Sequence, residues 1–97
     1  MTLSLIISPA AREDLRSIHQ YGSRHWGMTR SDEYMNSLKA KLWQLLQQPK
    51  TGKARPELSP DIYSASVTSH IIFYRIHQQE LQVIRILHAR QDVTRHL

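Results

Sequence analysis

The sequence contains no cysteine and few acidic residues, and its apolar runs are short. Without cysteine the chain can form neither a disulfide framework nor a thiolate metal site. The apolar run at residues 3–7 is too short for a signal sequence or a membrane span. We therefore expect a cytoplasmic protein that has no membrane partner.

Acidic side chains are outnumbered, with 8 Asp and Glu against 13 Lys and Arg, which gives a formal charge of +5. A positive charge speeds encounter with acidic macromolecules such as nucleic acid or an acidic protein. The six histidines show no tight ligand spacing and no clustered carboxylates that would complete a metal shell. We expect no metal, no cofactor and no small-molecule substrate.

The chain has 97 residues, of which 40% are hydrophobic and 22% charged. This length allows one hydrophobic core and is too short for two. The composition is that of a globular protein and differs from that of a disordered segment. We expect residues 1–97 to form a single domain.

A first helix is predicted over residues 9–24. Ser8 can cap its N-terminal amides, and Pro9 suits the first helical position. Its apolar positions recur every three or four residues, at Ala11, Leu15, Ile18 and Gly22. Gly22 would allow a neighbouring element to approach closely.

A second helix is predicted over residues 30–48, where Thr29 and Asp32 have the spacing of a capping box. Its apolar positions repeat in the same way, at Met35, Leu38, Leu42 and Leu45. Two amphipathic helices joined by a short loop form an antiparallel hairpin. Trp26 and Trp43 are expected to be packing residues of this hairpin or of the core.

Four strands are predicted. Residues 3–7 form a short β-prone run, and residues 62–67, 70–77 and 80–87 are rich in β-branched and aromatic side chains. The last three form an antiparallel meander, because only a few polar residues separate them. Residues 49–61 are basic and punctuated by proline, which favours an ordered surface connection. The predicted fold is α+β, with a helical hairpin packed on a small antiparallel sheet in the order β-α-α-β-β-β.

The last two strands are apolar on both alternating faces, whereas a half-exposed antiparallel sheet alternates apolar with polar residues. If Gln78 and Gln79 form a two-residue turn, one face carries Ile72, Tyr74, Ile76, Leu81, Val83 and Leu87, with Arg85 among them. The opposite face then carries Ile71, Phe73, Arg75, Gln82, Ile84 and Ile86. One helical hairpin covers only one face, so we expect a partner to cover the second.

Five segments together resemble the ParE branch of the ParE/RelE superfamily of bacterial type II toxins. They are SPAAREDL at residues 8–15, YGSRHWG at 21–27, QQPKTGKARPEL at 47–58, HIIFYRI at 70–76 and VIRILHARQDVTRHL at 83–97. The resemblance implies a helical hairpin against a small antiparallel sheet. It also implies a toxin held inactive by a cognate antitoxin protein, with DNA gyrase as its target.

The other branch of the superfamily comprises toxins similar to RelE and YoeB, which cut messenger RNA on the ribosome. Such cleavage needs a base, an acid and cations in one cleft, and this chain offers Tyr74, Arg75, His88, Arg90 and His96. However, it ends Arg-His-Leu where YoeB-like cutters end His-Tyr, and its LHARQD is similar to the LHGRRD of ParE. We expect no catalytic residue and a stoichiometric inhibitor, with messenger RNA cleavage or a simple nucleic-acid-binding module as alternatives.

Two overlapping sets of site residues are predicted. The antitoxin is expected to contact Ile71, Phe73, Arg75, Ile84, Ile86 and Arg90. The target is expected to contact Arg75, His88, Arg90, Arg95 and His96. The basic run at residues 39–55 has only Trp43 as an aromatic neighbour, so it does not support stacking of single-stranded nucleic acid there.

Overall fold

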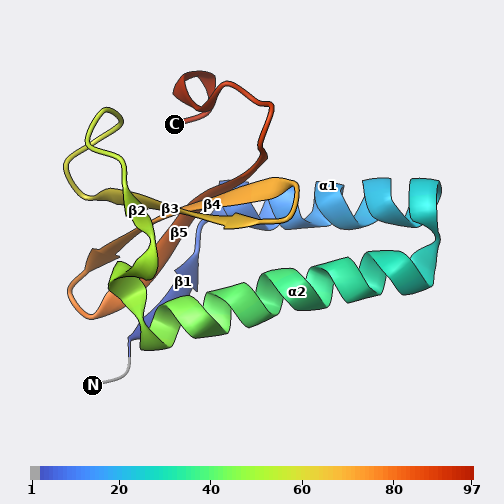
Figure 1. Cartoon of the computed structure of the whole chain (residues 1–97), viewed down its shortest axis with the longest axis horizontal. Helices are drawn as coiled ribbons and strands as arrows, with labels where there is room; N and C mark the ends of the chain where they lie inside the picture. Colours follow the sequence, from blue (N-terminus) through green and yellow to red (C-terminus); the bar gives the residue numbers. More distant parts are fainter. Residues whose placement is uncertain (1–2) are drawn as a thin grey trace.

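A helical hairpin lies on one face of a five-stranded sheet in the computed structural model, which describes residues 3–97 (Figure 1). The elements are β1 (Ser4–Ile7), α1 (Pro9–Trp26), α2 (Met28–Gln47), β2 (Lys53–Ala54), β3 (Ile62–Val67), β4 (His70–His77) and β5 (Glu80–His88). Short 3-10 turns occur at Pro49–Thr51 and Val93–Arg95. The predicted fold class and element order are confirmed, and β2 is an addition within the predicted surface connection.

The strands are ordered β1-β5-β4-β3-β2. The antiparallel meander of β3, β4 and β5 is confirmed. Strand β1, whose place the sequence left open, pairs in parallel with β5 from Ser4 opposite Glu80 to Ile7 opposite Val83. The sheet is therefore mixed, and its first and last strands are neighbours.

The start of α1 is fixed by Ser8, as predicted. Its Oγ accepts the Ala11 N–H at 3.0 Å and donates to the Ile84 carbonyl of β5 at 2.7 Å. One hydroxyl thus caps the helix and joins it to the sheet.

The turn between the helices is shorter than predicted. Gly27 alone separates α1 from α2, and its φ of 92° lies in the region that favours glycine. The predicted cap at Thr29 and Asp32 is wrong, because Gly27 occupies the N-cap position and α2 has no side-chain cap. The predicted close approach at Gly22 is confirmed, since a Cβ there would lie 2.7 Å from the Ser31 hydroxyl oxygen of α2.

The residues of β4 keep their predicted faces, but those of β5 differ from the prediction beyond the middle of the hairpin. Gln78 and Gln79 form the expected two-residue turn, but a β-bulge between Phe73 and Tyr74 shifts the register, so that Phe73 is opposite Arg85. The bulge inserts one extra residue into β5 and exchanges the faces of all later positions. Positions near the turn keep their predicted faces, whereas those beyond the bulge do not.

The predicted placement of Ile86 on the face away from the helices is therefore wrong. Ile86 pairs with Ile72, and both belong to the core beneath the helices. Leu87, predicted to face the helices, pairs with Ile71 on the opposite side, here named the open face. Arg85 lies on this side as well, which removes the difficulty of placing an arginine beneath the helices.

The open face is partly covered by the chain itself. Figure 1 shows the loop after β2 and the C-terminal segment on the side of the sheet opposite α2. Phe73 and Leu87 are both 2% exposed, although neither belongs to the core beneath the helices. The expected large apolar patch is thus reduced to a smaller hollow. Within residues 3–97, no helix is both long and apolar enough to cross a membrane.

Candidate antitoxin and target surface

Arg75 lies at the rim of the remaining opening on the open face. Its side chain is 47% exposed, its Nε donates to Gln82 Oε1 at 2.7 Å, and its Nη1 lies 3.9 Å from Asp61 Oδ2. The neighbouring hollow, here named the apolar hollow, is lined mainly by Ile6, Ile62, Ile84 and Leu97. This arrangement offers a cation beside apolar surface, which suits an amphipathic acidic segment.

Phe73 lies beneath Arg55 and is closed to a partner in this arrangement. The Arg55 guanidinium carbon is 5.6 Å from the centre of the Phe73 ring, and Arg55 Nε donates to Glu57 Oε2 at 2.7 Å. Arg55 was expected only as a member of the basic run at residues 39–55, because nothing in the loop pattern indicated that the loop folds back over β4. The basic run before Pro56 was the only feature of the sequence that pointed to a role for this arginine.

His88 and Arg90 lie at the other end of the sheet. Five positions of β4 separate Arg75 from His70, the partner of His88, which corresponds to about 17 Å along a strand. His88 Nδ1 accepts the Arg90 N–H at 3.1 Å, and its ring is 5.3 Å from that of His70. The structure thus divides the predicted target residues between two ends of the molecule.

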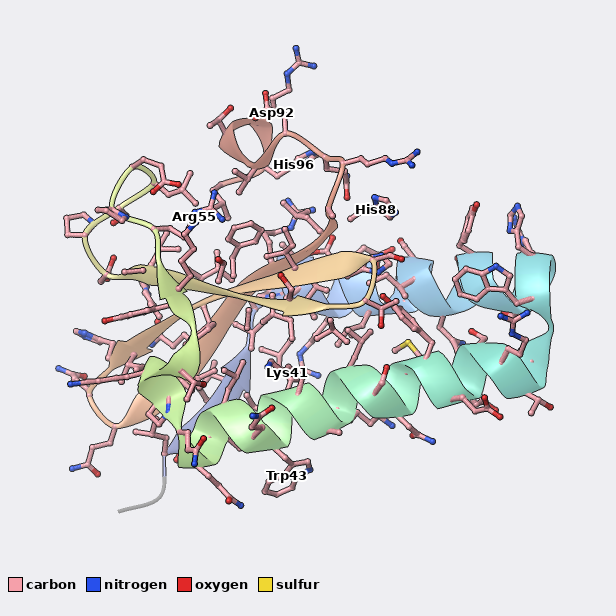
Figure 2. The ribbon with its side chains drawn as sticks, in the orientation of Figure 1. Lys41, Trp43, Arg55, His88, Asp92 and His96 are labelled. Carbon is pink, nitrogen blue, oxygen red and sulfur yellow. The ribbon has the colours of Figure 1, made fainter. Side chains whose placement is uncertain are left out.

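The C-terminal segment carries His96 and Arg95 over the open face. Figure 2 shows His96 and Asp92 on the same side of the sheet as Arg55. The His96 carbonyl accepts a hydrogen bond from Arg85 Nη1 at 3.2 Å. Arg95 is 83% exposed, and its Nε lies 3.8 Å from Asp92 Oδ2. Arg95 is therefore available to a partner, whereas the backbone at His96 anchors the segment.

Asp14 is the residue whose structural role the sequence analysis missed. It binds both Nε and Nη2 of Arg85 at 2.8 Å and accepts the Ile86 N–H at 2.9 Å. Strand β1 ends at Ile7, opposite Val83, so Asp14 takes over a hydrogen bond along the edge of β5 that a longer β1 would supply. An arginine within an apolar strand, with an acid in the adjoining helix, was the available signal.

The residues considered for RNA cleavage do not form one cleft. The Tyr74 hydroxyl donates to the Pro49 carbonyl at 2.7 Å and accepts the Gly52 N–H at 3.1 Å. The Tyr74 side chain is fully buried, and burial raises the pKa of its hydroxyl. Tyr74 therefore anchors the loop before β2, and a Cβ at Gly52 would collide with its hydroxyl.

Solved structures define the fold class. The fold matches a chain of the chromosomal ParDE toxin-antitoxin system from P. aeruginosa with a TM-score of 0.78 and 20% identity, covering 90% of this chain and 96% of that one. It matches a mutant of the E. coli toxin RelE in the free state with a TM-score of 0.66 and 23% identity, covering both chains fully. The fold is that of the ParE and RelE toxins.

Sequence comparison then identifies the family. The family model described as "ParE toxin of type II toxin-antitoxin system, parDE" matches residues 5–93. Toxin ParE1 of Mycobacterium tuberculosis is 32% identical over 98 residues, covering both chains fully. Toxin ParE1 of Caulobacter vibrioides is 28% identical over 91 residues, or 94% of each chain. The chain belongs to the ParE family, the toxins of type II toxin-antitoxin systems.

Proposed function

We propose that this toxin acts as a stoichiometric inhibitor of DNA gyrase and is neutralised by an acidic antitoxin. The resemblance to ParE supports the target. The observation that carries the mechanism is the distribution of acid, base and cation over separate ends of the sheet, with the Tyr74 hydroxyl held by two backbone groups. In general acid-base cleavage of RNA, the base, the acid and the cations must all lie within hydrogen-bond reach of the same bound substrate.

The antitoxin is proposed to enter the apolar hollow and to place an acidic group on Arg75. A cation that is 47% exposed retains water, and a carboxylate at the rim would add a charge-assisted hydrogen bond. Ile71 and Ile84 remain proposed contacts of the antitoxin. Arg90 would extend this contact to the end of the sheet away from Arg75. Phe73 takes part only if Arg55 moves, and Ile86 is no longer a proposed contact, because it is buried in the core beneath the helices.

Purified toxin added to gyrase and supercoiled plasmid is expected to trap cleaved DNA at a toxin-to-gyrase ratio near one. A stoichiometric inhibitor saturates at this ratio, whereas a catalyst acts well below it. Agarose gels after denaturation measure the trapped complexes. Unaffected gyrase at excess toxin, together with cleavage of messenger RNA on programmed ribosomes, would instead establish the nuclease alternative.

Arg75→Ala is expected to weaken antitoxin binding by roughly three- to tenfold, since it removes a partly exposed charge contact. Calorimetric titration with the antitoxin measures the change. Arg16→Ala is the matched control, because Arg16 is also an exposed arginine in a weak ion pair, but lies on α1. Equal affinities for the two variants would remove Arg75 from the proposed surface.

A further inference from the structure

The helical hairpin extends past the sheet at one end of the molecule (Figure 1). A row of aromatic and imidazole rings joins α1, α2, β4 and β5 at this end. Successive ring centres are 3.8, 6.1, 6.0, 5.5 and 5.3 Å apart, in the order His25, Tyr21, Trp26, Tyr34, His70 and His88. Tyr21 is 57% exposed and Trp26 is 42% exposed, so both of these rings keep open surface. Contrary to the sequence-based expectation, Trp26 is only partly used in packing.

Four of these rings, those of Tyr21, Trp26, His70 and His88, border a hollow of about 350 Å³ between α1 and the ends of β4 and β5, here named the aromatic hollow. Its lining residues are Ser17, Ile18, Tyr21, Trp26, Ser69, His70, His88 and Gln91. Mostly apolar walls with a few convergent polar groups are the general form of a site for a small planar ligand. The volume suits one ring system together with its substituents.

The rings around the hollow are held in place before any ligand arrives. His25 bonds the Tyr21 carbonyl through Nδ1 at 2.8 Å and stacks on the Tyr21 ring at an interplanar angle of 19°. The Tyr34 hydroxyl lies 2.6 Å from His70 Nδ1, and His88 Nδ1 accepts the Arg90 N–H. Such restraint lowers the entropic cost of stacking a ligand.

The polar groups of the hollow favour a hydrogen-bonding ring. His88 Nδ1 accepts a hydrogen bond, so the proton of the neutral imidazole is on Nε2, which is left to donate. Gln91 Oε1 accepts the backbone N–H of His88 at 2.8 Å, which leaves the amide nitrogen of Gln91 to donate. Both groups suit the carbonyl and ring-nitrogen acceptors at the edge of a nucleobase.

The surroundings of the hollow are basic. Arg90 lies between the lining residues His88 and Gln91, and Arg30 shares with Trp26 the lining of an adjoining hollow. Glu33 is the acidic residue among that second lining. One arginine next to the lining residues in sequence and one in the adjoining hollow suit a chain that carries one phosphate with each base. An apolar protein side chain would leave these cations without a partner.

We propose that the aromatic hollow binds a nucleobase of single-stranded nucleic acid, with Tyr21 and Trp26 as stacking surfaces and Arg30 and Arg90 as phosphate contacts. This site lies at the end of the sheet away from Arg75. It does not depend on gyrase as the target, although it shares Arg90 with the proposed antitoxin contact. The sequence does not support base stacking at residues 39–55, and the structure assigns such stacking to the aromatic hollow.

The test uses the full chain carrying Trp43→Phe, which leaves Trp26 as the sole tryptophan. Addition of a ten-nucleotide oligothymidylate at low salt is expected to quench Trp26 fluorescence saturably, with AMP acting more weakly. Tyr21→Ala should raise the dissociation constant about tenfold, because one stacking surface is lost. Arg90→Gln should lower the number of counterions released on binding by about one, as measured from the salt dependence of the dissociation constant.

Met28→Ala is the matched control, because Met28 is 58% exposed near the same turn but does not line the hollow. It should leave the dissociation constant unchanged, and circular dichroism should show that every variant is folded. Three results would overturn the proposal. The first is the absence of saturable quenching. The second is that a duplex binds equally well and Tyr21→Ala has no effect. The third is that N-acetyltryptophanamide alone saturates the aromatic hollow.

Discussion

Asp14 forms three hydrogen bonds to β5 from the second turn of α1. Its side chain is 13% exposed and that of Arg85 is 21% exposed, so the pair is largely removed from water. The hydrogen bonds that Arg85 donates to Asp14 raise the pKa of Arg85, which keeps the guanidinium charged. A buried ion pair of this kind is costly to break, because the remaining charge has no replacement partner.

Asp14→Asn is expected to lower the free energy of unfolding by about 2–3 kcal/mol, since Arg85 would stay buried without its carboxylate. Urea denaturation followed by circular dichroism measures the loss. Glu13→Gln is the matched control, because its pair with Arg16 is well exposed, and it should change stability by less than about 0.5 kcal/mol. Similar losses in both variants would contradict the assigned role of Asp14.

His70 makes stability depend on pH. Burial, followed by the nearby His88, lowers the pKa of His70 below its ordinary value of 6.5, while Asp14 opposes the shift. The unfolded chain therefore takes up a proton more readily than the folded one as the pH falls below about 6.5. The stability that His70 contributes is present above this pH and is lost on acidification through its lowered folded pKa.

We expect the urea midpoint to fall between pH 7.5 and 5.5, and His70→Gln to flatten this decline, because glutamine does not titrate. The amide of Gln can still meet the Tyr34 hydroxyl. His77→Gln provides the control, since His77 is exposed on the same strand. An unchanged pH profile in His70→Gln would assign the decline to other groups.

At the scale of elements, the β4-β5 hairpin carries a strained turn. Gln78 and Gln79 have φ values of 49° and 64°, a region that side-chain-bearing residues other than Asn and Asp rarely adopt. Two-residue hairpin turns of this geometry prefer Asn-Gly. The strain identifies a position where the sequence does not match its local conformation.

Replacing Gln78 and Gln79 by Asn and Gly is expected to raise the free energy of unfolding by about 1 kcal/mol. The midpoint of urea denaturation measures the gain. Gln20→Gly, in the exposed face of α1, should instead lower stability by about 1 kcal/mol. A loss in the turn variant would mean that the Gln side chains make contacts that outweigh the backbone strain.

The elements themselves could be predicted from local patterns, but the bulge could not. Ser8, Gly22 and the two-residue turn each carry a local chemical signal that the structure bears out. The bulge after Phe73 has no such signal, because β5 is apolar on both faces and tolerates either register. Strand β2 was missed for a related reason, since a strand of two residues, Lys53 and Ala54, is too short to form a pattern.

At the scale of the whole molecule, the site was harder to predict than the fold. Arg75 and Ile84 could be foreseen at one surface, because their strands and turn were known. The coverage of Phe73 by Arg55 depends on how a long loop folds back, which local patterns do not encode. The row of rings likewise joins residues from α1, α2, β4 and β5 that are far apart in sequence.

The parallel pairing of β1 with β5 has a consequence for how the toxin is made. Residues 4–7 are synthesised before their partners at residues 80–83, with the helical hairpin and the other strands between them. A nascent chain therefore keeps the apolar side chains of β1 unpaired until β5 has been made. Any product that stops before Glu80 lacks the strand that completes its sheet, so partial chains are expected to be harmless to the cell that makes them.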